Sequence, residues 1–79
     1  MIVTTTWYSI LRDEAGRDEE SWDLPGGTAA DLYRRAFARH GFTLPADRLR
    51  VAVNDSFSEM DRNLSDGDRV VFIAPVGGG

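Results

Sequence analysis

The last three residues of this 79-residue chain, Gly77, Gly78 and Gly79, offer the clearest chemistry in the sequence. Because glycine has no Cβ, an extended glycine segment fits a channel that any side chain would block. Four residues starting at Val76 reach at most about 13–14 Å, enough to carry the chain end into a partner's pocket. There the Gly79 carboxylate can attack a nucleotide α-phosphate, and the resulting acyl adenylate can accept sulfur or another nucleophile. The alternative is an inert, floppy tail.

The other titratable side chains favour structural roles. His40, the only histidine, is expected to be a capping or surface group at a helix end, not a catalytic base. A Ser-His-Asp triad would need His40, and no nucleophile-elbow pattern accompanies it. Five acids crowd residues 13–20 without the spacing of a calcium loop, so a solvated loop is expected there and no metal site is predicted. These acids are Asp13, Glu14, Asp18, Glu19 and Glu20.

Basic and glycine-rich segments also give weak signals for a ligand. Arg34, Arg35 and Arg39 fall outside the apolar stripe of a predicted helix, so they are expected to form a solvated face and not a phosphate site. Gly26 and Gly27 precede that helix without a P-loop pattern, which favours a turn.

Composition limits the class of protein. Hydrophobic residues make up 42% and charged residues 28%, as in ordinary globular domains, and 79 residues form one domain with a thin core. The absence of cysteine excludes disulfides, zinc–thiolate sites and a cysteine nucleophile. A net charge of −4 disfavours nucleic acid as a partner. No apolar run is long enough to span a membrane and no signal peptide is visible, so a cytoplasmic location is expected.

Residue patterns predict an α+β domain, with a mixed sheet of four to five strands and one main helix packed on one face. Apolar residues recur at helical spacing from Ala29 to Phe37. Thr28 and Asp31 resemble a capping box, and Gly41 suits the helix end. The first and last strands are expected to be parallel neighbours. In chain order we predict strand 2–8, loop 12–20, strand 21–24, helix 28–41, strand 49–53, short strand 57–60, turn 64–68 and strand 69–74.

One face of this sheet is expected to lack a covering helix. Strand alternation places Val71 and Ile73 on that face together with Tyr8. An uncovered apolar patch on a thin domain predicts docking to a partner. Arg12 lies one helical turn's length from Tyr8, and an interface role and an ordinary surface role are equally open for it.

Several segments resemble a known family. Residues 8–16 (YSILRDEAG) look like the signature in the first part of the small, sulfur-carrying subunit of molybdopterin synthase, in the MoaD/ThiS family. Residues 51–55 and 64–79 are similar to the rest of that family, and the match covers nearly the whole chain, including the helix at 28–41. The Asp-Gly-Asp turn and terminal Gly-Gly are shared with sulfur carriers for thiazole synthesis. Gly77 stands where the family tolerates various residues.

The resemblance implies a ubiquitin-like β-grasp domain over residues 1–75 and a flexible Gly-Gly tail over 76–79. It also implies that an E1-like activating enzyme adenylates Gly79 with ATP and that a sulfur donor protein converts the adenylate to a thiocarboxylate. The tail, threaded through Gly77 and Gly78, then enters the large subunit of molybdopterin synthase, which holds the catalytic pocket. Its thiocarboxylate attacks the cyclic pyranopterin monophosphate. The chain itself is expected to bind no cofactor stably. Tyr8, Arg12, Val71, Ile73 and Pro75 would form the docking surface.

Three rival functions share the same tail. A sulfur carrier for thiazole or cysteine synthesis is the nearest, and the segment 8–16 argues against it. A ubiquitin-like modifier would attach Gly79 to protein amines. The absence of lysine forbids lysine-linked chains of this protein but not attachment to other targets. A plain binding domain with an inert tail is the third.

Overall fold

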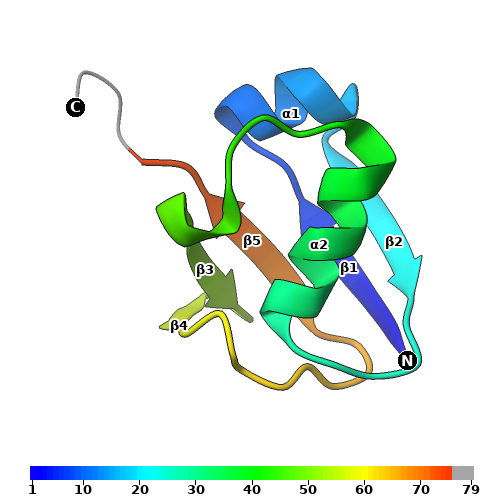
Figure 1. The fold of residues 1–79 in the computed structure, drawn as a ribbon. Helices are drawn as coiled ribbons and strands as arrows, with labels where there is room; N and C mark the ends of the chain where they lie inside the picture. Colours follow the sequence, from blue (N-terminus) through cyan, green and yellow to red (C-terminus); the bar gives the residue numbers. More distant parts are fainter. Residues whose placement is uncertain (76–79) are drawn as a thin grey trace.

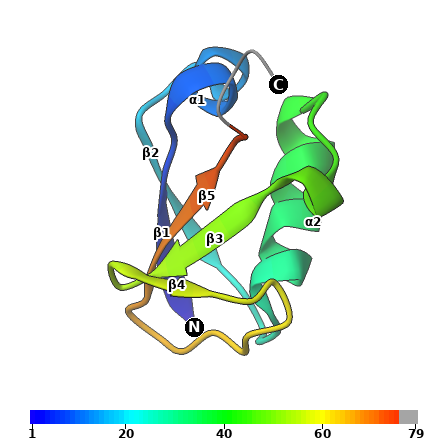
Figure 2. The ribbon, with the colours of Figure 1, turned by 90° about the vertical axis from the view of Figure 1, so that its left-hand side faces the viewer.

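The computed structural model describes residues 1–75. The roles predicted for Gly77, Gly78 and Gly79 concern residues outside this range. Five strands form one mixed sheet in the order β2-β1-β5-β3-β4, and helix α2 packs across one face of it (Figure 1, Figure 2). The elements are β1 (Ile2–Thr6), α1 (Ser9–Ala15), β2 (Glu19–Asp23), α2 (Ala29–His40), the 3₁₀ turn η1 (Ala46–Arg48), β3 (Arg50–Val53), β4 (Ser56–Ser58) and β5 (Arg69–Ile73). This confirms the predicted architecture and the order of its strands.

The two central strands are parallel, as predicted. β1 pairs with β5 from Thr4 opposite Arg69 to Thr6 opposite Val71. β2 and β3 flank them with antiparallel pairing, and β4 returns beside β3. Because side chains alternate between the faces of a strand, this register puts one set of residues under α2 and the other on the uncovered face.

Helix α2 begins and ends where its sequence predicts. The Thr28 hydroxyl accepts from the Asp31 backbone N–H at 3.2 Å, while the Asp31 carboxylate accepts from the Thr28 N–H at 2.9 Å. These bonds, with Arg34 close by, lower the pKa of Asp31. Gly27 precedes the cap with φ of 120°, and a Cβ there would come within 2.7 Å of the Asp31 carboxylate. The box therefore depends on glycine at this position.

The core lies between α2 and the sheet and is dominated by aromatic rings. Trp7 is 1% exposed, stacks on Phe72 with centroids 6.0 Å apart and meets Phe42 edge-on at 5.1 Å. Tyr33 donates its hydroxyl to the Leu44 carbonyl at 2.6 Å. Burial, with the nearby Glu14 charge, raises the pKa of Tyr33 to about 12. The tight ring packing fixes α2 against the sheet.

Helix α1 replaces much of the predicted loop at 12–20, and that prediction was wrong. The helix has seven residues, its N-cap Tyr8 makes no side-chain capping bond, and only Leu11 is buried. Such a helix carries neither a capping signal nor a long apolar stripe. Packing of Leu11 against the core, with Ala15 beside it, holds the helix in place, and Gly16 ends it with φ of 74°.

The largest differences between predicted and observed strand bounds are in β1, β2 and β4. β1 ends at Thr6 and not at residue 8, because Tyr8 caps α1. β2 begins at Glu19, two residues early, and β4 covers only Ser56–Ser58. Asn54 and Asp55 have φ of 51° and 71°, the conformation of a tight hairpin turn between β3 and β4.

The Asp68 carboxylate connects the turn before β5 to the hairpin between β3 and β4. Asp68 accepts from the Ser65 N–H at 2.8 Å and from the Asn54 side-chain amide at 2.9 Å. These bonds lower the pKa of Asp68. The Asp-Gly-Asp turn is therefore tied to the β3–β4 hairpin before β5 begins.

Candidate functional site

The sheet surface away from α2, here called the open face, carries an apolar row across four strands. Val71 on β5 sits opposite Thr6 of β1 on one side and Ala52 of β3 on the other, and Ala52 sits opposite Phe57 of β4. Ile73 shares the face two residues further along β5. Val71 and Ile73 are half-buried by their neighbours and Phe57 is 72% exposed. No helix covers this side of the sheet in Figure 2.

Tyr8 joins this row at the end of β1. Its side chain is exposed, and its backbone is extended, with φ of −131° and ψ of 157°. The parallel register, continued two residues past Thr6, places Tyr8 beside Ile73. Trp7 and Phe72, which precede Tyr8 and Ile73, stack on each other, so the two segments are still adjacent at that position. The predicted grouping of Tyr8 with Val71 and Ile73 is therefore compatible with the strand register.

Arg12 and Pro75 lie at the border of this surface. The Arg12 N–H donates to the Tyr8 carbonyl at 3.3 Å, so the two residues are one turn apart on α1. The Arg12 guanidinium is half-exposed and 3.9 Å from an Asp18 carboxylate oxygen. Pro75 is exposed just after β5 ends at Ile73. Their roles in binding stay predictions.

Phe57 is a large exposed residue of the open face that was not part of the predicted docking surface. It stands on the short edge strand β4, and the Arg50 guanidinium lies 5.8 Å from its ring centroid. The exposure of Phe57 could not be predicted from side-chain alternation in a strand of three residues. The turn signal at Asn54 and Asp55 could have fixed the hairpin register, which places Phe57 opposite Ala52 on the open face.

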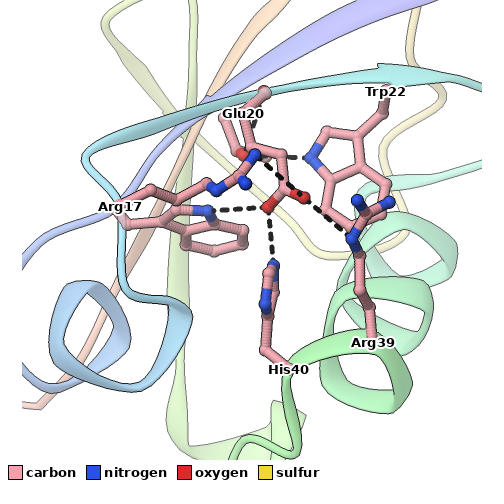
Figure 3. A network of polar contacts seen from close by, with 7 residues as sticks. Arg17, Glu20, Trp22, Arg39 and His40 are labelled. Carbon is pink, nitrogen blue, oxygen red and sulfur yellow. Dashed lines mark hydrogen bonds and ion pairs between the residues drawn. The ribbon is translucent and has the colours of Figure 1, made fainter.

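Beneath α2, the opposite face holds a buried carboxylate that corrects two predictions. Glu20 was expected in a solvated loop and His40 at the surface, but the Glu20 side chain is 2% exposed and that of His40 is 10% exposed. The Glu20 Oε1 atom lies 2.6 Å from His40 Nε2 and accepts from the Trp7 indole N–H at 3.2 Å. Figure 3 shows His40 and Arg39 converging on Glu20 from α2.

The second oxygen of Glu20 meets two guanidinium groups. Its Oε2 atom is 3.1 Å from Arg39 Nε and 3.8 Å from Arg17 Nη1, without hydrogen-bond geometry. Arg39 also lies over the Trp22 ring, 5.5 Å from its centroid. Arg39 was expected to be a solvated residue, but it pairs with Glu20 and packs on Trp22. The network fastens the end of α2 to β2, which is a structural task, and it lies on the side of the sheet opposite the open face.

The acids of 13–20, which were not expected to bind a metal, point in different directions. Glu14 accepts from the Thr43 N–H and hydroxyl at 3.1 and 2.8 Å, while Glu20 points into the core, so the acids of 13–20 do not converge. Within residues 1–75 no cluster of three or more acidic or histidine side chains could hold a metal. Over the same residues, no helix has the length and apolar character to cross a membrane.

Comparison with known proteins gives a consistent set of relatives. The profile of the ThiS family matches residues 8–79. The chain is 31% identical over 81 residues to the molybdopterin synthase sulfur carrier subunit of Escherichia coli (strain K12), covering 99% of this chain and 100% of that protein.

Two solved structures share the fold at a TM-score of 0.82. One, from Pyrococcus furiosus and assigned as subunit 1 of a molybdopterin converting factor, is 31% identical, and the match covers 96% of this chain and 99% of that one. The other, SAMP1 from Haloferax volcanii, is 20% identical over the whole of both chains and is a likeness of fold alone. The sheet order and its single covering helix are those of the ubiquitin-like β-grasp.

Proposed function

This chain belongs to the ThiS family of sulfur carriers, and from that premise we propose that it carries sulfur for the synthesis of molybdopterin. The proposal follows the Escherichia coli relative, which is by name the sulfur carrier subunit of molybdopterin synthase. In this role the chain supplies sulfur to a larger subunit of the same synthase, which holds the catalytic pocket.

One observation on this molecule carries the proposal. The apolar row of the open face crosses β5 at Val71, and β5 is the last strand before the chain end. A partner that covers Val71, Ile73 and Phe57 therefore sits beside the point where the chain leaves the sheet. Apolar surface of this kind, left uncovered on a small domain, is typical of a protein interface.

The chemistry proposed for the end of the chain has three steps. A Gly79 carboxylate oxygen attacks the α-phosphate of ATP on an activating enzyme, and pyrophosphate leaves. Sulfide delivered by a donor protein then displaces AMP from the acyl adenylate, which leaves a thiocarboxylate on Gly79. Finally the thiocarboxylate sulfur forms a C–S bond to the cyclic pyranopterin monophosphate in the large subunit and displaces an oxygen substituent. Water then cleaves the bond between the Gly79 carbonyl and sulfur, so the sulfur stays on the pterin and Gly79 regains its carboxylate. Gly77 and Gly78 allow the narrow passage that these transfers need.

Extension of the chain tests the proposal. One residue added after Gly79 moves the carboxylate away from the activating site, so we expect no thiocarboxylate on the extended protein purified from its native cell. Intact mass spectrometry detects the sulfur-for-oxygen exchange directly. As a control, the chain carries an extension that a protease can remove. Cleavage back to Gly79 should restore the mass gain when it is measured again. An extended chain that still gains sulfur would contradict the proposal.

The same mass measurement separates the rival functions. Conjugates in which Gly79 is joined to a target amine would identify a protein modifier. Transfer of sulfur to a thiazole or cysteine precursor, without transfer to the pyranopterin in the presence of the large subunit, would identify another carrier. Loss of the sulfur to the pyranopterin is the outcome that we expect.

A further inference from the structure

A groove lies between helix α2 and residues 24–26, the segment that follows β2, away from the open face. Its volume is about 460 Å³. Leu24, Pro25 and Ala38 give it an apolar floor, and Asp31, Arg34 and Arg35 stand along its rim. Helix α2 supplies the charged residues of this lining, and it lies across the face of the sheet opposite to the open face (Figure 1).

The strand that leads into this segment, β2, is an edge strand of the sheet. In the described part of the chain, no strand lies outside β2. Met1 and Leu24 exchange both backbone hydrogen bonds, at 2.7 and 2.8 Å. Antiparallel alternation therefore turns the backbone groups of Glu19, Ser21 and Asp23 to the outer edge. Such a row of N–H and C=O groups is a template for one more strand.

On the α2 side of this edge, the local charge is opposite to that of the whole chain. The protein has a net charge of −4, yet four of its nine arginines, Arg17, Arg34, Arg35 and Arg39, gather on the α2 side of β2. Among residues 1–75, the ion pairs of these arginines involve two carboxylates, those of Glu20 and Asp31, at 3.1 Å from Arg39 and 2.9 Å from Arg34.

Arg35 is the arginine best placed to meet a ligand. Its side chain is exposed at the rim of the groove and makes no ion pair with any residue in 1–75. Arg34 and Arg39 keep 76% and 59% of their side chains exposed although each has a carboxylate partner. Guanidinium groups bind carboxylates through paired hydrogen bonds, so acidic side chains are the favoured ligands.

We propose that this groove binds an extended, acidic segment of a partner protein, which adds to the sheet as a strand beside β2. The backbone of the segment pairs with Glu19, Ser21 and Asp23. Its apolar side chains face Leu24 and Ala38, and its acidic side chains reach the arginines of the rim. Glu19 and Asp23 point their side chains to the open face, so neutral residues suit the outward positions of the segment. Occupancy of the groove leaves the docking surface free.

A designed probe tests the groove with the intact protein. The probe is the labelled peptide Thr-Val-Thr-Val-Thr-Glu-Thr-Glu, in which the apolar and acidic side chains share one face of a strand. The control peptide carries Lys in place of both Glu. We expect the acidic peptide to bind about tenfold or more tightly than the basic one, as measured by fluorescence anisotropy. In ¹⁵N spectra, the amides of Glu19, Ser21 and Asp23 should shift and gain protection from exchange.

Variants then separate the charge contacts from the strand pairing. Arg35→Glu should weaken binding of the acidic peptide by about tenfold, whereas Arg48→Glu, the same change on the exposed turn η1, should alter it less than about twofold. A peptide N-methylated on alternate residues should lose binding in the register that blocks pairing, and this test leaves the protein unchanged. Ser21→Pro removes an outward N–H at a position where an edge strand tolerates proline, so this variant should also weaken binding of the acidic peptide.

Three outcomes would overturn the inference. Equal binding of the acidic and basic peptides, or no binding of either, would remove the charge argument. Shifts confined to the open face around Tyr8 and Phe57 would move the peptide to the docking surface. A β2-to-β2 dimer in sedimentation equilibrium would show that a second copy of this chain occupies the edge.

Discussion

The two faces of the sheet use the same alternating strands for different purposes. Under α2, aromatic rings pack around Trp7, and the carboxylate of Glu20 is held by His40 and Arg39. On the open face, Phe57 and Tyr8 keep 72% and 57% of their surface in water. A buried face is specified by complementary packing, whereas an exposed apolar face gains nothing for the isolated fold. The first face therefore builds the domain, and the contrast supports the proposal that the second face meets a partner.

The largest expected effect comes from two phenylalanines on opposite faces. Phe72→Ala should lower the free energy of unfolding by about 3–5 kcal/mol, because it opens a cavity beside Trp7 and Tyr33. Phe57→Ala, the matched change on the open face, should alter it by less than about 0.5 kcal/mol. Urea denaturation of both variants measures the difference. Similar losses for the two would mean that the open face also stabilises the domain.

Neighbouring glutamates give the next comparison. Glu20→Ala leaves the Trp7 indole N–H and His40 without their buried acceptor and should cost about 3 kcal/mol of unfolding free energy. Glu19→Ala, one residue earlier and exposed on the other face, should cost less than about 0.5 kcal/mol. Thermal melts followed by circular dichroism give both values. If the two variants melted together, the buried network would have no structural weight.

A smaller effect is expected in binding. Tyr8→Ala should weaken the complex with the large synthase subunit by about tenfold, or about 1.4 kcal/mol, since an exposed aromatic anchor is removed. The melting temperature should change little, because Tyr8 contributes no buried surface to the core. Isothermal titration calorimetry measures the affinity, with Arg48→Ala as a control away from the open face. An unchanged affinity would exclude Tyr8 from the interface.

The smallest effect concerns pH. Hydrogen bonds from Ser65 and Asn54 lower the pKa of Asp68, so its carboxylate stabilises the folded state above the ordinary value of 3.8. That contribution is lost as the pH falls through the ordinary value and then the lowered one. Asp68→Asn should therefore cost less than about 1 kcal/mol at neutral pH, given solvent screening, and nothing in strong acid. Parallel urea titrations at the two pH values check this, and a constant difference would refute the linkage.

Local sequence signals predicted much of this molecule. The capping box of Thr28 and Asp31, the apolar stripe of α2 and the alternation of Val70 and Phe72 act within a few residues, so they could be read without the fold. Helix α1 could not, because one buried leucine holds it against a core made of distant segments. The alternation that places Trp22 inward also places Glu20 inward, and this signal was present but outweighed by the acids around it.

By itself, the sequence determined the order of the strands, the helix that crosses them and a chain end whose three glycines suit transfer chemistry. Only the tertiary structure decided that Glu20 and His40 form a buried pair, that Phe57 joins the open face and that Arg34 and Arg35 line a groove with Leu24. The physical reason is range. Propensity, capping and alternation depend on neighbours along the chain, whereas burial and charge pairing depend on residues that meet only when the sheet closes under α2.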